Sequence, residues 1–245
     1  MIAKAIEKIL QISAPAMIYT ETGNYVNLNV ATLKRIPVTM KAAPLEVSTL
    51  GAFVQYITEI AEQMDDTGMD NYFVHVESPT CVKFVSALNE DRERECLIMA
   101  KPILPKIPFE SYIETEKMII ILQANFQMDP KTDLDTVKKF VGTVTAGTVK
   151  DYSDNGVSQQ ATVRSGPRGK ENAEVPSPCL LRPVRTFTEV QQPASEFVFR
   201  LKEQGDTVYA GLFEADGGAW RISAMATIAD CLREALKETG VPVVA

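Results

Sequence analysis

The sequence predicts an α+β fold with mainly antiparallel sheets and amphipathic helices packed on one face. Three observations support this prediction. Apolar residues alternate with polar or mixed ones over 197–202 and again over 208–213, and the pair Gly205-Asp206 between them is typical of a hairpin turn. The segment 220–235 has apolar residues at helical spacing. The segment 72–100 contains three short strand patterns separated by turn residues, as in a meander; the first alternates, and the last, 96–100, is continuously apolar, as in a central strand.

The first hundred residues predict helices and strands in alternation. A short amphipathic helix is expected near the N-terminus, and it ends before Pro15. Gly23-Asn24 suits a turn, and Ser48 or Thr49 can cap a helix whose apolar stripe runs from Leu50 to Met64. The expected elements, in order, are a helix over 2–13, a strand over 26–30, a helix over 50–64, and strands over 72–77, 82–85 and 96–100.

Three prolines mark the best boundary in the chain. Pro102, Pro105 and Pro108 make a stiff connection, because proline restricts the backbone and removes an amide donor. We therefore expect two subdomains, an N-terminal one over 1–101 and a C-terminal one over 109–245.

The second subdomain starts with an ambiguous segment. A helix is predicted over 110–117, whereas the apolar run within 118–126 fits a buried helix or a buried strand. Later elements are a helix over 134–144, strands over 148–153 and 157–165 joined by the turn Asp154-Asn155-Gly156, a long polar loop over 166–178, and a helix that ends near Gly240.

Composition excludes several classes of protein. The chain has 245 residues, 45% of them apolar and 23% charged, which is ordinary for a globular protein. Its net charge of −7 makes nucleic acid an unfavoured partner. No apolar run approaches the length of a membrane span, and the N-terminus lacks the features of a signal peptide. The four cysteines show no close spacing, so we expect small buried thiols in a reducing cytoplasm and no structural zinc.

Catalytic motifs are weak throughout. His75 is the single histidine and lies on a predicted strand, where a structural role is favoured. The segment 166–171 ends like a phosphate-binding loop, but its first glycine is misplaced and Glu171 stands where the hydroxyl residue would be. Glu214 and Asp216 beside two glycines fit a strand-to-helix corner better than a cation site. The sequence therefore predicts no catalytic residue, no metal and no cofactor.

Two groups of cations are candidates for binding a ligand or a partner surface. The first lies in the polar loop region and could hold a small anion. The second group comprises three arginines, of which Arg182 and Arg185 lie in apolar surroundings, where arginine usually pairs with a carboxylate or binds an anionic ligand; Glu189 and Glu196 are the nearest candidate partners in sequence. The candidates are Arg164, Arg168 and Lys170 in the first group, and Arg182, Arg185 and Arg200 in the second.

Several short motifs in the C-terminal half resemble a known family. They are the turn at 154–156, Ser158-Gln159, the run Leu180 to Phe187 with its two arginines, Gln192-Pro193 with Ser195 and Phe197, and the run Leu212 to Trp220. Together they resemble the uncharacterised bacteriophage and prophage proteins of the YfdQ-like kind, best over 140–240. The resemblance implies a phage-encoded protein that acts in the bacterial cytoplasm, and it supplies no reaction, cofactor or catalytic residue.

The function expected from the sequence is that of a non-enzymatic phage accessory protein that works as a homo-oligomer. Arginine and aromatic residues are enriched at interfaces, and both occur in the segment 178–200. Two alternatives stay open: a module that binds or sequesters a small anionic ligand such as a nucleotide, and an accessory protein in phage DNA replication or recombination.

Overall fold

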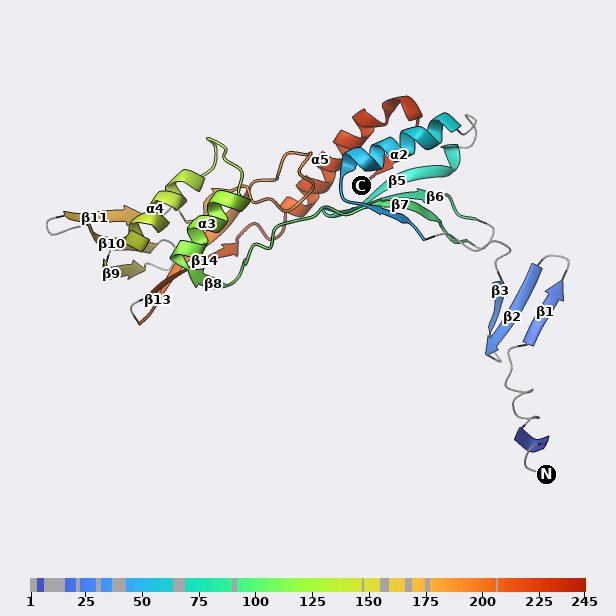
Figure 1. The fold of residues 1–245 in the computed structure, drawn as a ribbon, viewed down its shortest axis with the longest axis horizontal. Helices are drawn as coiled ribbons and strands as arrows, with labels where there is room; N and C mark the ends of the chain where they lie inside the picture. Colours follow the sequence, from blue (N-terminus) through green and yellow to red (C-terminus); the bar gives the residue numbers. More distant parts are fainter. Residues whose placement is uncertain are drawn as a thin grey trace.

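The computed structural model contains helices and two large sheets, so the predicted α+β fold is confirmed (Figure 1). Helices lie on one side of each large sheet, as expected. The structure describes residues 4–6, 16–20, 23–29, 32–36, 43–63, 69–89, 92–146, 148–154, 159–165, 169–174, 177–205 and 207–245.

The first lobe is a five-stranded sheet with two helices on one face. Its strand order is β15-β5-β6-β7-β4, and the central pairs are antiparallel, whereas the two edge strands pair in parallel. Its elements are β4 (Leu45–Val47), α2 (Leu50–Gln63), the single turn η1 (Met69–Asn71), β5 (Tyr72–Ser78), β6 (Cys81–Ser86), β7 (Cys96–Ala100), α5 (Trp220–Ala235), η2 (Lys237–Thr239) and β15 (Val243–Val244).

The second lobe is a four-stranded antiparallel sheet, also with two helices on one face. Its strand order is β12-β13-β14-β8. Its elements are β8 (Tyr112–Glu114), α3 (Thr115–Asn125), α4 (Leu134–Ala146), β12 (Cys179–Leu181), β13 (Ser195–Gln204) and β14 (Thr207–Glu214).

Two small three-stranded antiparallel sheets complete the described elements. One has the order β1-β2-β3 and the other β11-β10-β9. Their strands are β1 (Ala16–Thr20), β2 (Gly23–Asn29), β3 (Thr32–Ile36), β9 (Thr148–Asp154), β10 (Gln159–Ser165) and β11 (Gly169–Glu174).

Each lobe has its own apolar core, and these cores do not follow the subdomain limits expected from the sequence. The first core contains Phe53, Ile57 and Phe84, but also Phe187 from the loop after β12 and Ile228 from α5. The chain therefore leaves the first lobe after β7, contributes to it again through the loop between β12 and β13, and returns to it with α5 after β14. The returning helix is needed because one helix cannot bury a whole face of a five-stranded sheet.

The amphipathic elements of the sequence are largely confirmed. The helices expected over 50–64 and 134–144 are α2 and α4, and the hairpin around Gly205 is β13–β14. The buried face of α5 consists of Ala224, Ile228, Ala229 and Leu232, whereas Cys231 and Ala235, which also recur at helical spacing in this segment, are exposed.

Three local predictions were wrong. Gly23 and Asn24 begin strand β2 and do not form a turn. Residues 112–114 are strand β8, not helix, while the ambiguous run from Met118 to Leu122 is helical. The expected loop over 166–178 contains β11, whose polar sequence GKENAE has weak strand propensity but pairs with β10. Strands β8 and β11 owe their conformation to pairing with β14 and β10, and not to the pattern of their own residues. Most of the expected N-terminal helix, Val30 of the expected strand over 26–30, and the turn residues Asn155 and Gly156 lie outside the described residues.

We predict that Phe187→Ala destabilises the first lobe by about 4 kcal/mol, because Phe187 is fully buried in its core and its removal leaves a cavity. Denaturant unfolding followed by circular dichroism measures this loss. Gln191→Ala in the same loop is the control, since Gln191 is exposed and should change the free energy of unfolding by no more than about 0.5 kcal/mol. Equal stabilities of the two variants would contradict the placement of this loop in the first core.

Candidate functional site

Arg185 lies at the junction of the two lobes and contacts elements of both. Its guanidinium pairs with Glu214 at the end of β14 (Nη1 to Oε1, 3.0 Å) and donates from Nη2 to the Ser195 hydroxyl at the start of β13. The same group lies 3.9 Å from the ring centre of Trp220 on α5 and 5.6 Å from that of Phe197. One side chain therefore joins the sheet of the second lobe to a helix of the first.

Gln192 holds the loop that presents Arg185. Its side-chain oxygen accepts hydrogen bonds from the backbone amides of Arg185 (2.9 Å) and Thr186 (3.1 Å), and its amide group donates to the carbonyl of Phe187 (2.8 Å). Thr186 in turn donates its hydroxyl to the carbonyl of Pro79 in the β5–β6 turn. Arg185, Thr186, Phe187 and Gln192 are all buried. The conformation of this loop is therefore set by its internal network of hydrogen bonds.

The corner after β14 was expected to be either a turn or a cation site, and it is a turn. Asp216 accepts hydrogen bonds from the amides of Gly218 (2.9 Å) and Trp220 (3.2 Å), which caps the start of α5. Gly217 and Gly218 have φ of 61° and 83°, a conformation that favours glycine. Glu214 also approaches Arg221 (3.7 Å), so both carboxylates are already engaged by the protein.

Trp220 is the centre of a cation–π cluster. It is only half-buried, with Arg185 over its ring and Arg221 4.8 Å from its ring centre. Two guanidinium groups near one indole repel each other, and the carboxylate of Glu214 offsets that repulsion by contacting both.

Burial has an electrostatic cost at this junction. Removal of Arg185 from water lowers its pKa to about 10, although Glu214 acts in the opposite direction. The group stays charged at neutral pH. Its Nε and the indole Nε1 of Trp220 are buried without an acceptor in the part of the chain that the structure describes. Such groups lose hydration without a replacement hydrogen bond, so the other contacts of Arg185 and Trp220 must offset this cost.

Arg182 is also held by a carboxylate of the protein itself. Its Nη1 lies 2.7 Å from Asp129 in the loop before α4, and both side chains are mostly buried. The partners proposed from the sequence were wrong for both arginines: Glu189 accepts a hydrogen bond from the Leu50 amide (2.7 Å) at the start of α2, and Glu196 is exposed. The true partners lie far along the chain, where sequence proximity gives no signal.

Arg200 lies elsewhere, on the side of the second-lobe sheet that faces away from α3 and α4. Residues of β13 alternate, so Phe197, Phe199 and Leu201 enter the core while their neighbours face outward. No described helix packs on this outward side. We call it the open face; it comprises Leu180, Glu196, Val198, Arg200, Lys202, Tyr209, Gly211, Phe213, Tyr112 and Glu114.

The aromatic residues of the open face form a connected patch. Tyr112 and Phe213 make an edge-on pair with ring centres 5.5 Å apart, and the ammonium of Lys202 lies 5.8 Å from the Tyr112 ring centre. Both rings lie against Gly211, where an added Cβ would come within 2.9 Å of Phe213 and 3.2 Å of Tyr112. Neither aromatic was a candidate from the sequence: the alternation in β14 places Phe213 opposite the core, whereas Tyr112 lies in a segment that was expected to be helical.

The loop cations are placed only by their backbone. Arg164 on β10 and Lys170 on β11 are directly opposed in the antiparallel register, and Arg168 lies outside the described residues. The six candidate cations therefore do not converge on one site: Arg182 and Arg185 have separate carboxylate partners, Arg200 lies on the open face, and Arg164 and Lys170 belong to a small hairpin.

The cysteines occupy different environments. Cys179 is buried, Cys81 and Cys96 are half-buried, and Cys231 is exposed, which corrects the expectation that all four are buried. Burial raises the pKa of Cys179 to about 12 and, with a hydrogen bond to Glu77, that of Cys81 to about 11. The described residues include no cluster of three or more metal-ligating side chains, and no described helix has the length and apolar character to cross a membrane.

No protein-family model, no curated protein and no solved structure matches this chain.

We predict that Arg185→Ala lowers the free energy of unfolding by about 3 kcal/mol, because it leaves Glu214 partly buried without its main partner. Arg185→Lys should restore little of this loss, since an ammonium cannot bind Glu214 and Ser195 at once while it stacks on Trp220. Thermal and urea unfolding measure both variants.

The matched control for this prediction is Arg233→Ala, because the ion pair of Arg233 with Asp230 is exposed on α5 and contributes little. If Arg185→Ala and Arg233→Ala unfold at the same urea concentration, the junction has no special role in stability.

Proposed function

We propose that this chain is a non-enzymatic accessory protein, of bacteriophage or prophage origin, that works as a homo-oligomer. The observation that carries the proposal is the open face of the second lobe. Both helices of that lobe lie on the opposite side of the sheet, and the open face presents aromatic side chains, a residue type enriched at protein interfaces, next to aliphatic ones.

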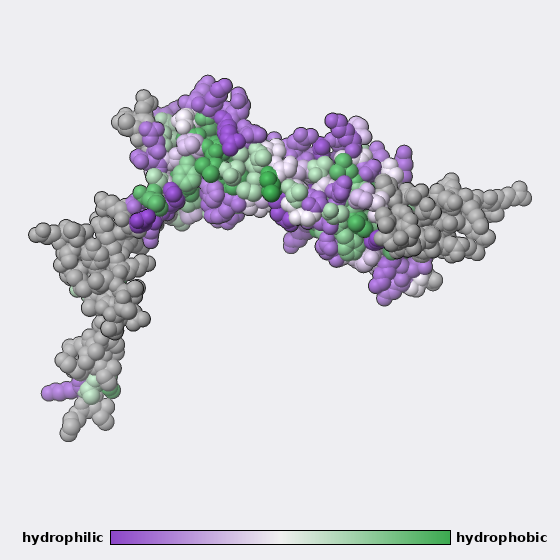
Figure 2. Space-filling view, turned by 180° about the vertical axis from the view of Figure 1, so that it is seen from behind, coloured by the Kyte–Doolittle hydropathy of each residue, from purple (hydrophilic) through white to green (hydrophobic). Residues whose placement is uncertain are grey.

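A second observation supports association. Large apolar side chains are exposed on several elements, with Ile222 on α5 and Ile103 in the connector between the lobes among the most exposed. Figure 2 displays apolar residues (green) at the surface of both lobes among polar ones. The phage origin is supported by the resemblance of the motifs over 140–240 to the YfdQ-like proteins.

The test of association is light scattering after size exclusion at micromolar concentration. We expect a mass of at least twice the 27.0 kDa of the chain. A measured mass that falls on dilution toward the mass of a single chain agrees with the proposal, because an assembly with small interfaces dissociates at low concentration. A mass of one chain at every concentration up to about 100 μM would refute it.

A second candidate function is binding of a small anion by the β10–β11 hairpin. The register opposes Arg164 and Lys170, and like charges directly opposite one another destabilise a strand pair. A bound phosphate would relieve that repulsion. The geometry of the hairpin backbone therefore favours this alternative over any site at Arg182 or Arg185, whose charges are already paired.

We predict that, if this alternative holds, inorganic phosphate or a nucleotide raises the melting temperature and that Lys170→Ala abolishes the rise. Lys139→Ala on α4 is the control, because it removes the same charge from a helix surface. Differential scanning fluorimetry with a phosphate and nucleotide panel measures the effect. Identical responses of the wild-type protein and Lys170→Ala would exclude the hairpin as the site.

A further inference from the structure

The open face has charges at opposite ends of one strand. Glu196 and Lys202 both lie on β13, face the same side and are exposed. They are six residues apart, which corresponds to about 20 Å at the rise of a strand. They are too distant to pair within one chain, so each needs a partner from elsewhere or remains solvated.

The pattern between these charges is symmetric about Phe199. Val198 and Arg200 lie one residue to either side, and Glu196 and Lys202 lie three residues to either side. If a second copy stacks face to face with its β13 running in the opposite direction, each Glu196 meets the Lys202 of the other copy. A two-fold axis at the position of Phe199 therefore forms two Glu196–Lys202 pairs between the copies. An interface between two identical surfaces requires this self-complementarity.

We propose that the open face is the self-association surface of this protein, with the two copies of β13 antiparallel and Glu196 of each opposite Lys202 of the other. The inference rests on the homo-oligomeric function proposed above and specifies its interface. Aromatic residues from β8 and β14 flank the axis, because Tyr112 and Phe213 lie on the same face and contact each other.

The chemistry of the face favours a second copy over a polyanion. Glu196, Glu114 and Lys202 are exposed among the aromatic residues, so acidic and basic groups are both present. A surface that binds single-stranded nucleic acid instead combines stacked aromatics with an excess of cations. The acidic groups would repel phosphates, whereas Glu196 complements the exposed Lys202 of an identical face.

The size of the face fits a weak dimer. The four strands have 3, 10, 8 and 3 residues, and at a spacing of about 4.8 Å and a rise of about 3.3 Å per residue they outline about 380 Å². Two such faces give about 760 Å², which is the size of a weak, transient contact. The dimer should therefore dissociate at high micromolar concentration, where its strength can be measured.

The test exchanges the two charges. Glu196→Lys and Lys202→Glu should each raise the dimer dissociation constant at least about 10-fold, because each places like charges opposite one another twice. The double variant, with both exchanges in one chain, should return to within about 3-fold of the wild type, since the opposed pairs are restored with reversed sign. Analytical ultracentrifugation measures all three, and thermal melting confirms that each is folded.

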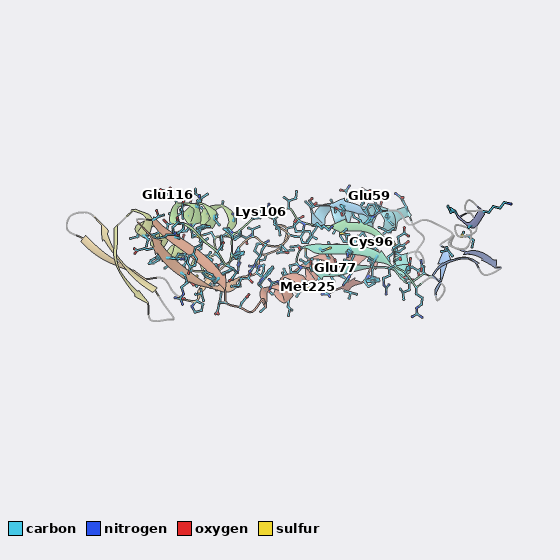
Figure 3. All side chains as sticks on the ribbon, turned by 90° about the horizontal axis from the view of Figure 1, so that it is seen from below. Glu59, Glu77, Cys96, Lys106, Glu116 and Met225 are labelled. Atoms are coloured by element: carbon cyan, nitrogen blue, oxygen red, sulfur yellow. The ribbon has the colours of Figure 1, made fainter. Side chains whose placement is uncertain are left out.

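A mixture of the two single variants gives an independent readout. On the open face of β13, one chain then carries two lysines and the other two glutamates, so they should form a mixed dimer more readily than either dimerises alone. Glu116→Lys is the control: Glu116 is exposed on helix α3 (Figure 3), and this variant should dimerise like the wild type.

The possible failures are distinguishable. A wild-type protein that is monomeric at all concentrations refutes the proposed function and this interface together. A wild-type oligomer that none of the charge exchanges weakens refutes only the interface. Binding of a single-stranded thymidine oligonucleotide that tightens in Glu196→Lys, while self-association is unchanged, would assign the open face to nucleic acid and overturn the inference.

Discussion

The structure depends on the buried guanidinium of Arg185. Arg185 lies beside the corner where the chain passes from β14 of the second lobe to α5 of the first. Its guanidinium contacts both elements, through Glu214 and Trp220. A charge in this position loses hydration, and only the simultaneous carboxylate, hydroxyl and aromatic contacts offset that loss. The requirement for all three fixes the direction in which β14 continues into α5.

The returning helix explains the shared architecture of the lobes. Each sheet has two helices on one side, and the first lobe obtains its second helix only because α5 comes back after β14. In Figure 1 the helices of both lobes lie on the same side, and in Figure 3, which is seen from below, the strands of both sheets come to the front. This one-sided arrangement leaves a mixed apolar and charged surface on which association depends in our proposal.

The arginines illustrate how one residue type takes different roles in one chain. Arg182 and Arg185 are neutralised by carboxylates that arrive from distant segments, and neither is available to a ligand. Arg200 differs because strand alternation turns it away from the core. A guanidinium can pair with a carboxylate inside the protein or lie half-buried on the outer side of a sheet, and its neighbours in space decide which.

The sequence by itself determined the helices α2, α4 and α5, the β13–β14 hairpin and the meander β5–β7, because their apolar residues repeat at the period of the element they form. It also determined which arginines lie in apolar surroundings. Only the tertiary structure decided that Asp129 and Glu214 are their partners, that residues 112–114 and 169–174 are strands, and that α5 belongs to the first lobe. These features depend on contacts between segments far apart in the chain, and periodicity within one segment carries no information about its neighbours in space.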